Sequence, residues 1–351
     1  MGVSLGNASS QKWGNGTDEG TLATLLTTVV PMLDSVILLT GLLGHSLVIV
    51  VMAGRRRRRG GLVAQGTDTL LVALSAADLL LLLCLPFHTA AIVLGSWPFG
   101  GFLCKLVSFL GVACSSASVY TLATLAVTRY LTVVHPTWAF RSRMHRRLKL
   151  TAALLWAPAA ALAAPQYAFR TVSTTAALHC FAFLSDLSQL VYGTALFLFA
   201  FALPLGVIVL MYARIFCFLR RTRRLGRAPQ LERYQRQVTH TSALLVVVFT
   251  LCWLPSYALM FSFIGGTISG NAGYRSLAIF VRLLASSSTV VNPVLYVFMS
   301  QKFRQDLVEL GRGRWVGCRR LLIGCPVVMG RDMVQPFNSV ELDTPSDRGQ
   351  P

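Results

Sequence analysis

A few ionisable side chains lie inside long apolar stretches of this sequence, among them Asp78, Arg129 and Arg282. Because a charge in an apolar segment is costly, such a residue is a functional candidate by default. A carboxylate of this kind can hold a cation or anchor a polar cluster. The planar fork of an arginine can bind a carboxylate through two hydrogen bonds. The chemistry that these residues predict is the binding of ions and of charged ligand groups.

Arrangements that would support catalysis are missing from the sequence. His240 and the eight cysteines are scattered, without the spacing of a zinc site, and no nucleophile stands in a catalytic constellation. We therefore expect that the chain is not an enzyme and that it needs no cofactor.

The composition indicates which kind of protein positions these side chains. Of 351 residues, 54% are apolar and only 13% are charged, against roughly 25% charged residues in soluble proteins. A net charge of +19 would suit a nucleic-acid-binding protein, but such proteins carry their charge on a soluble fold. The apolar excess also excludes a disordered chain. An integral membrane protein with no nucleic-acid partner remains.

Seven apolar stretches are long enough to cross a bilayer, which takes about 20 residues each. None shows the alternation of a barrel strand, so we predict helices. The fold class is an all-α membrane protein, a seven-transmembrane helix bundle. The stretches cover approximately 29–53, 69–94, 102–134, 148–168, 189–219, 238–264 and 274–299.

The basic residues predict how the bundle is oriented. Of the 32 Lys and Arg residues, 26 fall in the loops after the first, third and fifth stretches and in the tail after the seventh. Positive charge marks the cytoplasmic side, which places the N-terminus outside a plasma membrane. Two sequons, at Asn7 and Asn15, predict glycosylation of that outer segment. The absence of internal repeats argues against a transporter.

We predict four regions: a glycosylated extracellular segment over 1–28, the helix bundle over 29–300, a short amphipathic helix over 301–311, and a cytoplasmic tail over 312–351. Phe303, Leu307 and Leu310 share one face of the short helix, which suits the surface of the lipid membrane. Cys318 and Cys325 are candidates for palmitoylation there.

Several motifs occur in order, each on a different predicted helix, and together they carry a family resemblance. They are Asp78, Thr128-Arg129-Tyr130, Trp156, Pro204 with Tyr212, Cys252-Trp253-Leu254-Pro255, and Asn292-Pro293-Val294-Leu295-Tyr296. From about residue 29 to 310 the chain resembles the rhodopsin-like (class A) G-protein-coupled receptors. The runs Cys84-Leu85-Pro86-Phe87 and Trp97-Pro98-Phe99-Gly100 resemble the peptide receptors, in the galanin, kisspeptin and somatostatin neighbourhood. With its departures, the chain looks like a divergent or orphan member.

The resemblance implies roles for these residues. An allosteric sodium ion would bind at Asp78, Ser118, Ser288 and Asn292; the alternative is a hydrogen-bonded cluster that only packs the helices. A disulfide would join Cys104 to Cys180 and hold the loop between the fourth and fifth helices over the pocket. Activation and G-protein coupling would involve Arg129, Tyr212, Phe249, Trp253, Pro255, Pro293 and Tyr296. For Phe249, an aromatic that simply fills space is the alternative.

Three positions depart from the family pattern. His45 stands where the family nearly always has Asn; it could bridge Asp78 to the seventh helix, make signalling sensitive to pH, or simply pack. Thr128 replaces the acid that usually precedes Arg129, and Gln235 stands where a second carboxylate often lies. Neither restraint on Arg129 is then available, so we predict raised basal activity.

The pocket residues suggest the chemistry of the ligand. Gly111 stands where amine receptors carry an aspartate, which disfavours monoamines. Arg282 could take a ligand carboxylate, or its side chain could reach to the membrane interface. The candidate ligand-binding residues are His88, Gly111, Ser115, Phe181, Tyr257, Met260, Ala278 and Arg282, with Phe183 and Asp186 in the loop above.

We therefore expect a receptor that binds an extracellular peptide and activates a heterotrimeric G protein of the inhibitory class, with an arrestin and a receptor kinase as further partners. The alternative ligand is a lipid or a small carboxylate. A transporter, or a receptor-like protein that does not signal, is the alternative from another class.

Overall fold

Long helices make up nearly all of the chain that the computed structural model describes, which comprises residues 24–59, 65–135, 150–173, 179–182, 186–224, 229–265, 272–299 and 303–308. These residues all belong to one compact unit, Met1–Val308. The helices are η1 (Leu25–Val29, a π-helical turn), α2 (Val30–Arg59), α3 (Gln65–Leu94), α4 (Gly100–Val134), α7 (Trp156–Phe169), α8 (Asp186–Phe197), η2 (Leu198–Ala202, π-helical), α9 (Leu203–Arg224), α10 (Pro229–Ile264) and α11 (Ala272–Met299).

Six of the seven predicted spans appear as helices long and apolar enough to cross a membrane. The predicted fourth span is helical over 150–154 and over α7, with a turn at Leu155 between them. Pro158 has no N–H to donate to the carbonyl of Leu154, which explains an irregular ladder at this turn. The structure thus agrees with the expected helical membrane bundle.

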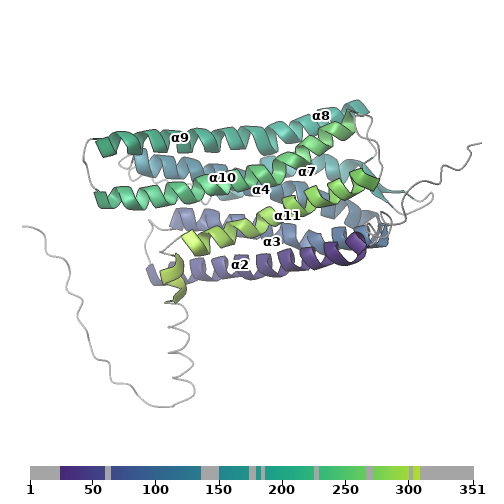
Figure 1. Ribbon diagram of the computed structural model, residues 1–351, viewed down its shortest axis with the longest axis horizontal. Coiled ribbons are helices and arrows are strands. Elements are labelled where there is room, and N and C mark those ends of the chain that lie inside the picture. The colour runs from purple at the N-terminus through teal and green to yellow at the C-terminus, as the bar shows by residue number, and fades with distance from the viewer. Residues whose placement is uncertain are drawn as a thin grey trace, which may run out of the picture. The chain divides into compact units, whose positions relative to one another are not determined.

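The helices run side by side along the length of the bundle (Figure 1), and their packing contacts close a ring. α3 packs between α2 and α4, α4 packs against α7 and α9, α10 packs between α9 and α11, and α11 returns to α2. The exterior is strongly apolar: Leu43 is 73% exposed and Leu187 is 72% exposed. A water-facing surface would not keep such side chains in this density, whereas a lipid-facing surface requires them.

A short antiparallel hairpin is the one sheet of the described chain. β1 (Arg170–Val172) pairs with β2 (Cys180–Ala182), with Thr171 opposite Phe181. The hairpin lies at the right-hand end of the bundle in Figure 1, which we name the disulfide end because Cys180 is bonded there to Cys104.

Near the opposite end, residues 303–308 form a short helix after α11. Phe303 is buried against Val48, Val51 and Met52 of α2, with Leu307 beside it. The apolar face predicted for this segment is therefore used for packing against the bundle. Leu310, Cys318, Cys325 and the sequon residues Asn7 and Asn15 lie outside the described residues.

Close helix contacts depend on small side chains, and one of them, where α2 meets α11, has a rigid neighbour. A Cβ added at Gly44 would lie 2.8 Å from both Cβ and Cγ of Pro293, and a proline ring cannot rotate out of the way. We predict that Gly44→Ala lowers the free energy of unfolding by about 1–3 kcal/mol through overpacking.

The check is the thermal unfolding of purified protein, with Gly206→Ala as the matched control. A Cβ at Gly206 of α9 would meet no heavy atom within 4 Å, so this variant should be as stable as the wild type or slightly more stable. Equal unfolding temperatures for Gly44→Ala and Gly206→Ala would contradict the predicted close contact.

Candidate functional site

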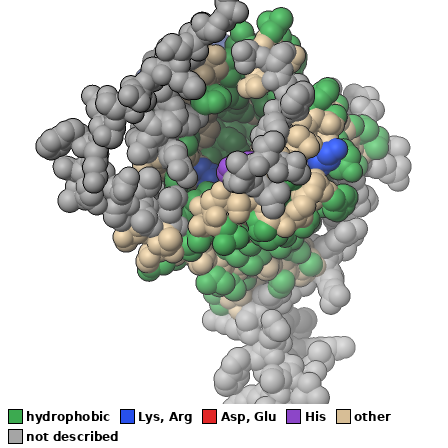
Figure 2. All heavy atoms as spheres, turned by 90° about the vertical axis from the view of Figure 1, so that its right-hand side faces the viewer, with side chains coloured by type: hydrophobic (Ala, Val, Ile, Leu, Met, Phe, Trp, Pro, Cys, Tyr) green, Lys and Arg blue, Asp and Glu red, His purple; other side chains and the backbone are tan. Residues whose placement is uncertain are grey.

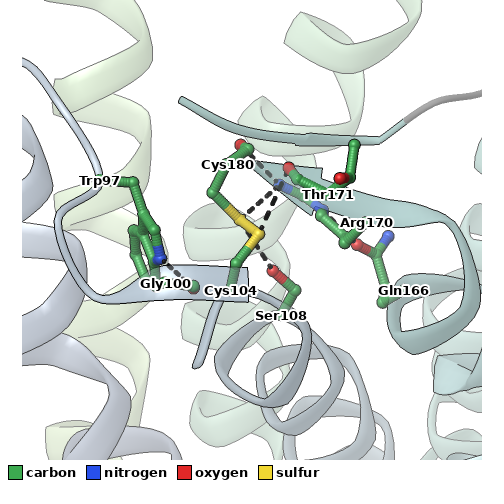
Figure 3. The surroundings of a disulfide bond; sticks show 8 residues. All are labelled: Trp97, Gly100, Cys104, Ser108, Gln166, Arg170, Thr171 and Cys180. Atoms are coloured by element: carbon green, nitrogen blue, oxygen red, sulfur yellow. Dashed lines mark hydrogen bonds between the residues drawn. A yellow bond between two sulfur atoms is a disulfide. The ribbon is translucent and has the colours of Figure 1, made fainter. Parts of the chain in front are cut away.

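The disulfide predicted between Cys104 and Cys180 is present and fixes the hairpin to the start of α4, with a Cα–Cα distance of 5.7 Å. Arg170 strengthens the attachment: Nη1 donates to the carbonyl of Cys180 at 3.3 Å, and Nε donates to Oε1 of Gln166 at 2.9 Å. On the other side of the bridge, Nε1 of Trp97 donates to the carbonyl of Gly100 (Figure 3). The hairpin is therefore held by covalent and polar contacts from α4 and α7.

A cavity of about 410 Å³ lies among α3, α4, α10 and α11. The disulfide end is visibly hollowed, with hydrophobic side chains lining the hollow and basic and histidine side chains at its edge (Figure 2). Five of the eight candidate ligand-binding residues line this cavity: His88, Gly111, Ser115, Ala278 and Arg282. Its size lies within the range of ordinary small-molecule and side-chain pockets.

The other three candidates lie elsewhere. Tyr257 packs against Phe197 and Phe201, with ring centroids 5.5 and 5.1 Å apart, so it belongs to the contact between α10 and the α8–η2 segment. The Met260 side chain lies against Gly193 of α8. Phe181 lies in β2, and its side chain is outside the described part, as is that of Asp186; all of Phe183 is outside it.

A polar centre lies deeper in the bundle, around the buried carboxylate of Asp78. Oγ of Ser118 donates to Oδ1 and Nδ2 of Asn292 donates to Oδ2, both at 2.7 Å. Ser288 is close by but bonds elsewhere: its Oγ accepts from Nε1 of Trp253 at 3.1 Å. The four residues predicted for an ion site all line one small cavity of about 20 Å³.

His45 is the fifth member of this polar centre, at the position where the chain departs from the family pattern. Its Nε2 lies 2.8 Å from the carbonyl oxygen of Thr289 and 3.5 Å from Oδ2 of Asp78. A carbonyl only accepts, so Nε2 carries the proton and donates it to Thr289. Nδ1 is buried without a hydrogen-bond partner among the described residues. The sequence leaves three interpretations of His45 open, and these contacts agree with the one in which it bridges the Asp78 region to α11.

An aromatic column connects the two cavities to Phe201 of η2. Trp253 lines both cavities, Phe249 lies 6.1 Å from it between ring centroids, and Phe249 stacks on Phe201 at 6.1 Å. Pro255 lies within α10 and Pro293 within α11, where each removes one backbone hydrogen bond. Phe249 therefore fills space and also touches the tryptophan that borders both cavities.

Arg129 lies in the last two turns of α4, and no acidic side chain pairs with it in the part of the chain that the structure describes. The preceding Thr128 is buried, and its Oγ1 donates to the carbonyl of Thr124 at 2.8 Å, within its own helix. Tyr212 lies on α9, whereas the side chains of Tyr296 and Gln235 are outside the described residues.

Asp34 and Thr89 are the site residues that the sequence reading missed. Nη2 of Arg282 donates to Oδ2 of Asp34, and Oγ1 of Thr89 donates to the same oxygen. These three residues join α2, α3 and α11 at the disulfide end, so Arg282 does not extend to the membrane interface. The sequence does contain a signal for Asp34, because a lone aspartate in an apolar stretch is itself a candidate functional residue.

Comparisons with known proteins agree with this architecture. Residues 44–296 match the family described as "7 transmembrane receptor (rhodopsin family)". The galanin receptor type 2 of Mus musculus is 30% identical over 288 residues, which cover 81% of this chain and 76% of the receptor. The somatostatin receptor type 3 of Rattus norvegicus is 32% identical over 327 residues, covering 87% and 72%. The allatostatin-A receptor of Bombyx mori is 29% identical over 297 residues, covering 81% and 79%.

The fold and the site thus define a seven-helix membrane receptor, a multi-pass membrane protein and not an enzyme. The chain belongs to the rhodopsin family of seven-transmembrane receptors.

Proposed function

We propose that this receptor binds a peptide from outside the cell and activates a heterotrimeric G protein inside it. The observation that carries the proposal is the cavity of about 410 Å³ at the disulfide end, in a chain whose matched relatives are receptors for galanin, somatostatin and allatostatin-A. The distribution of the basic residues supports an orientation with this end outside the cell, and we place the receptor in the plasma membrane, where it would meet such a peptide. Inhibitory coupling follows from the resemblance to peptide receptors.

A small carboxylate or an acidic lipid is the second candidate ligand. Arg282 is the reason, because it places a cation on a mostly apolar cavity wall. Such a wall suits a ligand with an apolar body and an acidic head. A peptide with an acidic side chain or a free C-terminus would present the same chemistry.

The polar centre is proposed to hold an allosteric sodium ion that favours the inactive receptor. The residues fit such an ion: Asp78, Ser118, Ser288 and Asn292 supply oxygen atoms around one cavity of about 20 Å³, which exceeds the roughly 10–15 Å³ that one water-sized particle needs. The bound ion would supply a positive charge beside Asp78. The protein contributes the buried carboxylate, and Ser118 and Asn292 orient it.

Raised basal activity is the expected consequence of Thr128, whose hydroxyl is occupied within its own helix. In Thr128→Asp a carboxylate stands next to the long side chain of Arg129, and the attraction of opposite charges restrains that arginine in a partly buried site. We predict that ligand-free second-messenger signal falls severalfold in Thr128→Asp at equal surface expression.

Thr128→Ala is the control, because it removes the same hydroxyl and adds no charge; its basal signal should match that of the wild type. If the ligand-free signal of the wild-type receptor equals that of untransfected cells, the idea of raised basal activity fails.

The experiment that tests the function as a whole is a peptide-library screen in cells that carry sensors of Gα dissociation, with a ligand-free baseline for each sensor. The proposal predicts at least one peptide that activates a sensor of the inhibitory class. Activation by small carboxylates alone would favour the second candidate ligand, and silence of every sensor under every condition would count against a signalling receptor.

A further inference from the structure

The two members of the Arg282–Asp34 ion pair differ in how they face the cavity. Nη2 of Arg282 donates to Oδ2 of Asp34, and 23% of the arginine side chain remains exposed against 4% of the aspartate side chain. Arg282 lines the cavity and Asp34 does not. A molecule that enters the cavity therefore meets the cation, whose counter-ion is hidden behind it.

The described residues on the cavity wall include no carboxylate. Its ionisable side chains are Arg282, His88 and the thiol of Cys84, and the other lining residues are apolar or carry hydroxyl groups. Among the described residues that line the cavity, none competes with an incoming anion for Arg282. The competing charge comes from behind the wall, from α2.

Both partners of the pair have hydrogen-bonding capacity left. Nε of Arg282 and Oδ1 of Asp34 are buried, and neither has a hydrogen-bond partner among the described residues. The second oxygen of Asp34, Oδ2, accepts from Arg282 and from Thr89. Because a guanidinium has five N–H groups, Arg282 can take a second carboxylate without releasing the first.

We propose that Asp34 sets the affinity of this cavity for anionic ligand groups, as a buried rival for Arg282. A carboxylate of a peptide or of a small acid binds Arg282 from the cavity side, while Asp34 holds the same guanidinium from behind. The proposal rests on the proposed function, because it takes Arg282 as part of the ligand site. It adds a specificity-determining residue that does not line the cavity.

The direction of the effect on ligand binding can be predicted by removing the charge of Asp34 while keeping the shape of its side chain. Two carboxylates on one guanidinium repel each other in a site of low dielectric constant, so the Asp34 charge weakens the binding of an acidic ligand. Asparagine has the shape of aspartate and keeps an oxygen that can accept from Thr89 and Arg282. Asp34→Asn therefore removes the repulsion and leaves the arginine in place.

The test uses the purified full-length chain and two probes, N-acetyl-phenylalanine and N-acetyl-phenylalaninamide. The first has a carboxylate where the second has an uncharged amide. Binding is measured by direct titration and by the shift of thermal unfolding. We expect Asp34→Asn to bind the acid roughly tenfold more tightly than the wild type does, with binding of the amide unchanged. A merely structural role of Asp34 would change both probes together.

Two further variants complete the test. Thr40→Val is the control on the same helix α2: the hydroxyl of Thr40 is exposed and donates within the helix, both charges stay, and the acid-to-amide affinity ratio should equal that of the wild type. The double variant Asp34→Asn/Arg282→Gln has neither charge and should bind the acid and the amide alike. Should Asp34→Asn not fold, Asp34→Ser takes its place in the same comparison, because it also removes the charge, keeps an oxygen that can accept a hydrogen bond and leaves Arg282 unchanged.

The proposal is overturned if the acid-to-amide ratio is the same in the wild type and in Asp34→Asn, or if the double variant retains a preference for the acid. The assay contains no G protein, so its result is separate from that of the signalling screen. If the receptor signals but its acid-to-amide ratio does not differ between the wild type and Asp34→Asn, this inference fails and the proposed function stands.

Discussion

Arg282→Gln should be the more damaging of the two single changes in the ion pair, with a loss of about 3–5 kcal/mol in the free energy of unfolding. The reason is the difference in exposure: without Arg282, the carboxylate of Asp34 stays buried with only Thr89 as its hydrogen-bond donor. Asp34→Asn should cost less, because the arginine that loses its counter-ion is 23% exposed on a cavity wall and can reach water.

The measurement is a double-mutant cycle on thermal unfolding of the purified receptor. The double variant Asp34→Asn/Arg282→Gln should be more stable than Arg282→Gln alone, because it removes the buried charge together with its partner. Additive losses in the two single variants would show that the pair does not join α2 to α11 as the structure indicates.

Cys104→Ser should destabilise the receptor by about 2–5 kcal/mol and reduce its amount at the cell surface. The bridge spans 76 residues of sequence, and the hairpin that it holds is otherwise attached through Arg170 and the strand pair. Unfolding temperature in detergent and surface labelling in cells are the two readouts.

Cys217→Ser is the matched control, because Cys217 is an exposed free thiol on α9. It should leave both readouts close to the wild type, since a substitution on an exposed surface changes stability by about 0.5 kcal/mol or less. If Cys104→Ser also matched the wild type, the disulfide would not be what holds the hairpin.

The helical spans could be predicted from the sequence because apolarity over about 20 residues is a local property. Asp78, Ser118 and Asn292 could also be predicted to meet, since the family resemblance aligned the three helices that carry them. The break in the helix at Leu155 was harder to predict from the sequence, because the effect of a single proline on a helix depends on how its neighbours repack.

Contacts between distant segments were harder to predict. Asp34 and Arg282 are 248 positions apart, and the sequence around either residue does not predict that they pair. Tyr257 and Met260 are candidate ligand-binding residues, and the structure places both at the contacts of α10 with α8 and η2. A helix in a membrane is apolar on nearly every side, so its composition does not reveal which side faces the cavity.

The central claim is that this seven-helix chain transmits a signal to a G protein through the end of α4 that carries Arg129. The most direct measurement is Gα dissociation in living cells for the wild-type receptor and for Arg129→Ala, matched for surface expression and measured with and without the peptide library. The account predicts a wild-type signal from at least one Gα sensor that falls to the untransfected level in Arg129→Ala. A wild-type signal that is unchanged in Arg129→Ala, or no signal from any sensor, would contradict it.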